Sequence, residues 1–207
     1  MVKEKRQIIT LLFVITFIVM SIGASFAYFT AIQTSAVSSS TNVTAATTNT
    51  LTFAAGEPLL IRATLDNFGS GMNSLKNTTY ATATLKKGSV GATATYKYNV
   101  SFVLENNDFE YSTLEKSPEL LLNVTDDLNV LIKDIPGLTY KTINGMSGFD
   151  ITKVIGVYNI KTNYIITTDN LITHKWLAEV TFVNKTENQD INQGKKLSGF
   201  LKLDLVE

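Results

Sequence analysis

The chain has 207 residues, 44% of them hydrophobic, and its 18 Lys and Arg balance its 18 Asp and Glu, so the formal net charge is zero. This balance gives no electrostatic reason to expect a nucleic-acid partner, because such proteins gather Lys and Arg against phosphates. The chain has no cysteine and one histidine, which excludes disulfides, thiolate nucleophiles and zinc sites built from several His and Cys.

A long apolar run follows a basic stretch, VKEKR, at the N-terminus. Residues 8–20 read IITLLFVITFIVM, and small residues continue as far as Ala27. A basic start, an apolar stretch and small residues before a cut are typical of a secretory signal peptide. The pattern predicts cleavage between Ala27 and Tyr28, so that residues 1–27 are removed and Tyr28 begins the mature chain.

The same run has a second interpretation as an uncleaved membrane anchor. Residues 8–29 are enough to cross about 30 Å of hydrocarbon as a helix. The basic flank then keeps the N-terminus in the cytoplasm and places the rest outside. A buried core helix fits the length and the one-sided basic flank poorly. We favour the cleaved signal. Both leading alternatives limit membrane contact to residues 1–30 and predict an extracellular or cell-surface protein.

No residue between Gln7 and Gly56 is charged. After the apolar run, residues 28–50 are mainly Ser, Thr, Ala and Asn with a few larger apolar residues. A flexible polar linker is one interpretation. An extended segment is the other, because Thr and Val favour strands.

Short segments with strand character fill the remainder of the chain, and the roughly 180 residues left after the N-terminal segment suffice for one domain with a sizeable core. Residues 96–104 show the clearest alternation, with apolar side chains at every second position. The repeated ATAT on both sides of a glycine-containing turn predicts a hairpin of 79–86 with 91–105. Residues 161–163 predict a second hairpin turn, within 154–169. The other expected strands are 48–53, 59–65, 128–132, 172–184 and 197–207.

One segment favours a helical turn instead. Ser117 is a good N-cap, and Pro118 fits the first helical position, so residues 117–122 predict a short turn or helix. Helical periodicity is otherwise scarce after residue 31. The predicted fold is therefore all-β, a jelly-roll-like β-sandwich over residues 51–207, preceded by a hydrophobic N-terminal helix.

The segment GASFAYFTA, residues 23–31, resembles the processing region of the TasA/camelysin family of secreted biofilm-fibre and surface proteins. The resemblance implies a jelly-roll-like fold and a cut before Tyr28 by a dedicated signal peptidase of the SipW type. Metalloprotease activity has been linked to camelysin-type proteins, but the chain lacks H-E-x-x-H, so that activity does not carry over.

The sequence predicts no catalytic residue, no cofactor and no metal. His174 is the one imidazole available as a general base, yet no G-x-S-x-G supplies a nucleophile, and a strand histidine at the edge of a core explains it better. The loop 184–196 is rich in oxygen ligands but lacks the spacing of an EF-hand, which favours a solvated hairpin loop. The acidic residues lie in turn-like polar stretches, where they serve local backbone hydrogen bonds: Glu105, Asp108, Glu110, Asp126 and Asp127.

These features predict a structural subunit of an extracellular fibre or biofilm matrix rather than an enzyme. Residues 28–50 are the candidate donor strand, which would pair with the open sheet edge of another copy. The expected partners are copies of the chain itself, the signal peptidase, and cell-surface or matrix components. The residues assigned to assembly are Tyr28, Phe29, Ile32, Val37 and Val43.

Two alternatives stay open at this point. One is a membrane-tethered cell-surface binding or adhesion module that uses loops or the tyrosines Tyr80, Tyr96 and Tyr98. The other is a secreted hydrolase that uses two carboxylates converging in a cleft.

Overall fold

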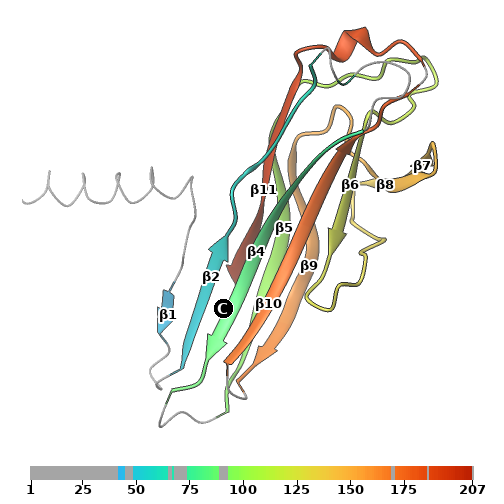
Figure 1. The fold of residues 1–207 in the computed structure, drawn as a ribbon. Helices are drawn as coiled ribbons and strands as arrows, with labels where there is room; N and C mark the ends of the chain where they lie inside the picture. Colours follow the sequence, from blue (N-terminus) through green and yellow to red (C-terminus); the bar gives the residue numbers. More distant parts are fainter. Residues whose placement is uncertain are drawn as a thin grey trace, which may run out of the picture. The chain divides into compact units, whose positions relative to one another are not determined.

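The computed structural model describes residues 42–44, 49–64, 67, 74–88, 93–168, 171–185 and 187–206. The described chain is all-β (Figure 1). Its elements in chain order are β1 (Asn42–Thr44), β2 (Thr50–Ala55), β3 (Leu59–Arg62), β4 (Leu75–Lys86), β5 (Thr95–Asn107), β6 (Leu120–Thr125), β7 (Thr139–Ile143), β8 (Met146–Asp150), β9 (Gly156–Thr167), β10 (Leu171–Phe182), the 3₁₀ helix η2 (Asp190–Asn192) and β11 (Lys196–Leu205).

The strands form two antiparallel sheets. A seven-stranded sheet has the order β1-β2-β4-β10-β6-β8-β7, and a four-stranded sheet has the order β3-β11-β5-β9. The longest ladder joins β10 to β4, from Leu171 opposite Lys86 to Phe182 opposite Leu75. In Figure 1, β5 and β9 lie behind β4 and β10, which belong to the other sheet.

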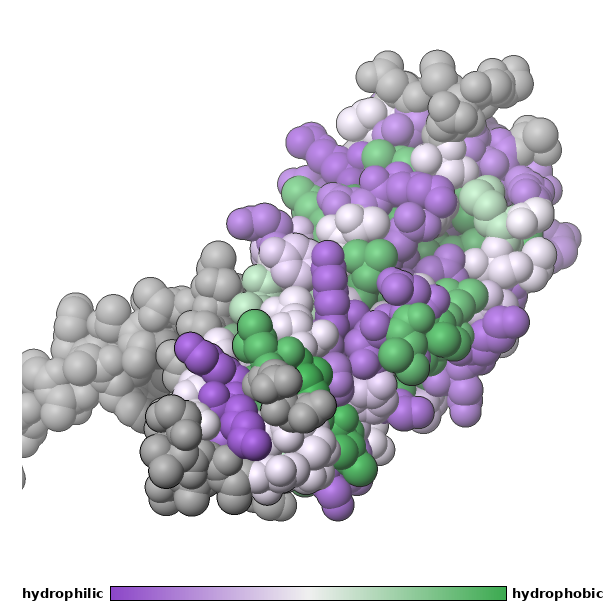
Figure 2. Space-filling model, turned by 60° about the horizontal axis from the view of Figure 1, so that its bottom comes forward, coloured by the Kyte–Doolittle hydropathy of each residue, from purple (hydrophilic) through white to green (hydrophobic). Residues whose placement is uncertain are grey.

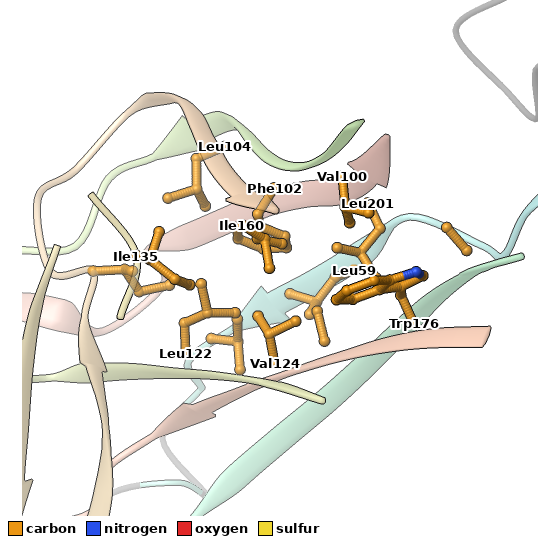
Figure 3. Packing of buried hydrophobic residues seen from close by; sticks show 14 of the residues in the cluster. Leu59, Val100, Phe102, Leu104, Leu122, Val124, Ile135, Ile160, Trp176 and Leu201 are labelled. Atoms are coloured by element: carbon orange, nitrogen blue, oxygen red, sulfur yellow. The ribbon is translucent and has the colours of Figure 1, made fainter. Parts of the chain in front are cut away.

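The inward faces of the two sheets share one hydrophobic cluster. Alternate residues of β5 and of β10 are buried there, as their period-two patterns predict. Side chains of the two sheets point toward one another in Figure 3, where Phe102 and Leu201 of the four-stranded sheet face Val124 and Trp176 of the seven-stranded sheet. Each large buried side chain contributes about 1.5–3 kcal/mol through removal of apolar surface from water.

The expected short helix at residues 117–122 is wrong, because Leu120–Thr125 is strand β6. Three consecutive leucines there are buried, as happens in a central strand covered on both faces. The strand expected at 128–132 is also wrong. Those residues follow a turn, and Leu131 makes an isolated bridge to Thr125.

Neither predicted hairpin forms. β4 and β5, which were expected to pair, belong to different sheets, so the chain passes from one sheet to the other between them. β9 runs unbroken through residues 161–163, where its register against β5 shifts and Asn163 has a φ of 53°. An extra residue is absorbed there as a bulge instead of a turn. The expected hydrophobic N-terminal helix lies outside the described residues.

Candidate functional site

A network of polar and aromatic side chains connects the two sheets around His174. The ring Nδ1 of His174, on β10, lies 2.9 Å from the hydroxyl of Tyr98, on β5. The Trp176 indole Nε1–H, two residues further along β10, donates to the same hydroxyl at 3.1 Å. Because His174 and Trp176 are alternate residues of one strand, both project toward Tyr98 in the opposite sheet.

Asp127, in the turn after β6, completes this network. One carboxylate oxygen accepts a hydrogen bond from the hydroxyl of Tyr164 on β9. The other lies 3.6 Å from His174 Nε2. Asp127 therefore contacts one residue from each sheet.

Burial sets the ionisation of these groups. It raises the pKa of Tyr98 well above its usual range, although the Trp176 hydrogen bond opposes the rise. Burial also raises the pKa of Tyr164, and the bond to Asp127 adds to this effect. For His174, burial lowers the pKa and the nearby Asp127 charge partly offsets that change. Since Tyr98 keeps its proton, we assign its hydroxyl as the donor to Nδ1, which puts the neutral imidazole proton on Nε2, toward Asp127.

The order carboxylate, imidazole, hydroxyl has the form of a proton relay, but its geometry does not support nucleophilic catalysis. Tyr98 is fully buried in the core, so its hydroxyl has no access to a substrate. A raised phenol pKa also makes the nucleophilic phenolate scarce. The network instead ties Asp127, β5 and β10 together. The burial of Tyr98 also removes it from the glycan- or protein-binding surface considered above.

This network predicts a pH dependence of folding stability. The unfolded His174 has a pKa near 6.5, and its folded pKa is lower. The unfolded state therefore binds more protons, so the stabilisation is complete above the unfolded pKa and is lost as pH falls through the window down to the folded pKa. We expect the free energy of unfolding to decrease from pH 7 to pH 5, by at most about 1.4 kcal/mol per pH unit.

Urea unfolding of wild type and of His174→Gln across this range tests the prediction. The difference between their free energies of unfolding should change with pH, because the variant has no titrating group at this position. Parallel curves for the two proteins contradict it.

A second buried network lies beyond the other end of β10. Lys185 Nζ is 2.6 Å from a carboxylate oxygen of Glu119, and both side chains are almost completely buried. The same oxygen accepts hydrogen bonds from the backbone N–H and the hydroxyl of Ser112. Gln189 donates to the other oxygen. The loop 184–196, expected to be solvated, is thus partly buried, because its polar side chains anchor it to the body.

Several of the remaining candidate acidic and loop residues serve local structure. Asp126 accepts the backbone N–H groups of Leu128 and Val130 in the turn after β6. Asn192 bonds to the backbone of Glu110 through both its amide oxygen and its amide nitrogen. Glu110 also forms an exposed ion pair with Lys153. These contacts favour structural roles for the clusters considered above as paired carboxylates or Ca²⁺ ligands.

Of the predicted assembly residues, Val43 lies in β1, opposite Leu51 of β2 in the same chain. Tyr28, Phe29, Ile32 and Val37 lie outside the described residues, as does the Ala27 cleavage position.

A groove that the sequence analysis did not anticipate runs between β9 and the segment 131–136. It has a volume of about 790 Å³ and a mixed lining, in which apolar residues such as Leu131 and Val157 alternate with the charged residues Lys133, Asp134 and Lys161. On the face drawn in Figure 2, hydrophobic residues form small separate patches among hydrophilic ones. Segments 131–136 and 157–162 are too far apart in sequence for spacing to reveal the groove.

The described part of the chain contains no group of three or more His, Cys, Asp and Glu placed to hold a metal ion. Across the same residues, no helix has the length and apolar character needed to cross a membrane. No family model, curated protein or solved structure matches this chain.

Proposed function

We propose that this protein is an extracellular structural subunit of a surface fibre or biofilm matrix, and that its copies assemble by strand addition. In this proposal the two sheets form a jelly-roll-like β-sandwich. The subunit polymerises with copies of itself and acts as a building element rather than as an enzyme.

The observation that carries the proposal is strand β1. Asn42–Thr44 belong to the charge-free interval, and they are extended and paired with β2 at the edge of the seven-stranded sheet. Residues 42–44 of this interval therefore extend a sheet by edge pairing within their own chain. Residues 28–41 have similar composition, and their lack of charge removes the desolvation cost that would oppose insertion into another copy.

Export follows from the N-terminal sequence in this proposal. A signal peptidase cuts after Ala27 and leaves the aromatic pair Tyr28 and Phe29 at the start of the mature subunit. The intact mass of protein from the native cell envelope tests this step. A mass that begins at Tyr28 supports the released subunit, whereas a mass that begins at Met1 indicates the tethered alternative.

Replacing Ile32–Ser40 with an equal length of Gly and Ser should abolish filaments. The change preserves length and leaves residues 23–31 intact for processing, but it removes the Thr, Val and Ile that favour an extended strand. Negative-stain electron microscopy of the exported protein measures the result. Circular dichroism should show a folded β domain in both proteins, and wild-type-length filaments in the variant contradict the proposal.

A further inference from the structure

β9 is the longest edge strand that the structure describes. It has 12 residues and pairs with β5 along one side, and no other described strand pairs with it. The edge strands β1, β3 and β7 have only 3, 4 and 5 residues. β3 is also partly covered, because Asn77 Nδ2 donates to the Leu60 carbonyl at 2.7 Å. A long edge presents a row of backbone donors and acceptors to an incoming strand.

The groove beside β9 has a fixed far wall. The Ile132 backbone N–H bonds to the Val124 carbonyl of β6 at 2.8 Å. Ile135 is buried in the core, which holds the segment 131–136 in place. Just before this segment, Asp127 accepts a hydrogen bond from Tyr164, which ties the chain that leads into the segment to β9. The groove therefore has an edge strand on one side and an anchored segment on the other.

β9 also carries features that restrict indiscriminate pairing. Its register against β5 shifts on both sides of Val100, and the exposed Lys161 lies in this stretch. Bulges and edge lysines are common means of discouraging edge-to-edge association. An incoming strand on the other side of β9 must therefore match both the groove and the bulged course of this strand, which selects for a matched segment.

The charge-free N-terminal segment is long enough to run along the whole of β9, including the part between residues 157 and 162 that lines the groove. Residues 28–41 number 14, which extend to about 46 Å, and the 12 residues of β9 extend to about 40 Å. The segment contains Ile32 and Val37 for the apolar residues of the lining and several Ser and Thr for its polar residues, and it carries no charge of its own. In its own chain the segment leads directly into β1, which is an edge strand of the seven-stranded sheet and is separated from β10 by β2 and β4. β9, in contrast, is an edge strand of the four-stranded sheet. This placement favours a second copy as the source.

We infer that residues 28–41 of a second copy pair with the free edge of β9 in the groove between β9 and segment 131–136. This inference rests on the proposed function and adds the acceptor site to it. Each added copy presents a new β9 edge, so heterologous contacts of this kind build an open filament when the rotation between successive copies does not close a ring.

Lysine substitutions at two matched edge positions test the site. Val157, on β9 in the groove, and Leu60, on β3 at the opposite edge of the same sheet, are 63% and 54% exposed. We expect Val157→Lys to reduce the sedimentable filament fraction by about tenfold or more, because the uncharged segment would cover the added ammonium group without offering a carboxylate to pair with it. Leu60→Lys should assemble like wild type. Circular dichroism and thermal unfolding establish that both variants are folded.

Cysteine crosslinking identifies the occupant, because the chain has no cysteine of its own. Chains with Val37→Cys mixed with chains carrying Val157→Cys should give crosslinked dimers with a short bismaleimide, and chains carrying Leu60→Cys in place of Val157→Cys should not. A doubly substituted Val37→Cys, Val157→Cys chain that crosslinks only within itself would show that the segment folds back on its own body, which overturns the inference.

The two proposals fail in different ways. Absence of filaments from the wild-type exported protein contradicts the proposed function, and the acceptor site with it. If the wild type forms filaments and Val157→Lys forms them equally well, the acceptor site is wrong. The same holds if Leu60→Lys loses filaments instead. In both cases the proposed function still stands.

Discussion

Replacing Lys185 with methionine lowers the free energy of unfolding by about 3–5 kcal/mol. The side chains of Lys185 and Glu119 are 3% and 0% exposed, so the substitution leaves a buried carboxylate without its cation. The hydrogen bonds from Ser112 and Gln189 remain, but they do not neutralise the charge. Urea unfolding followed by circular dichroism measures the change, with the slope of the transition checked for constancy.

An exposed ion pair supplies the control for this substitution. Lys76 and Glu179 lie 3.0 Å apart with side chains 52% and 32% exposed, so Lys76→Met should cost less than about 1 kcal/mol. The double variant Lys185→Met, Glu119→Leu should recover part of the loss, since it removes both charges. Equal effects of the two single lysine substitutions would contradict the interpretation that burial gives the Lys185 pair its importance.

Replacing Trp176 with alanine lowers the free energy of unfolding by about 3–5 kcal/mol. The indole is fully buried, and it packs edge-on against the Tyr164 ring with centroids 5.1 Å apart. Its removal leaves a cavity and takes away the hydrogen bond to Tyr98. Thermal and urea unfolding measure the loss.

Two further variants separate the causes of this effect. Trp176→Phe retains most of the ring and removes the N–H, so it should cost about 1–2 kcal/mol. Leu177→Ala changes the next residue of β10, which points to the opposite face and is 38% exposed, and should cost less than about 1 kcal/mol. If Leu177→Ala were as destabilising as Trp176→Ala, the assignment of the buried face would be wrong.

The polar network around His174 could be predicted from the sequence only in part. The sequence predicts that His174 is a strand histidine at the edge of a core, and the structure confirms this, since His174 is half-buried in β10 near the buried Trp176. It did not associate His174 with Tyr98 or Asp127, because 76 residues separate His174 from its Tyr98 partner. The ion pair of Lys185 with Glu119 spans 66 residues and was missed for the same reason. No local spacing encodes contacts of this range.

Two wrong predictions have related physical causes. The leucines at 120–122 were assigned to a helical turn because a short apolar run is ambiguous between a helix and a buried strand. The hairpin of 79–86 with 91–105 was inferred from similar sequences on both sides of a turn. That similarity does not determine whether the second strand pairs with the first or crosses to the other sheet.

The sequence by itself determined the all-β class, the position of most strands and the face that β5 buries. These properties are local, because the alternation of side chains along a strand is visible within one segment. Only the tertiary structure decided which strands pair, which edge is long and open, and where the groove beside β9 lies. Strand pairing joins segments distant in sequence, and it depends on packing across two whole sheets rather than on the residues of any one strand.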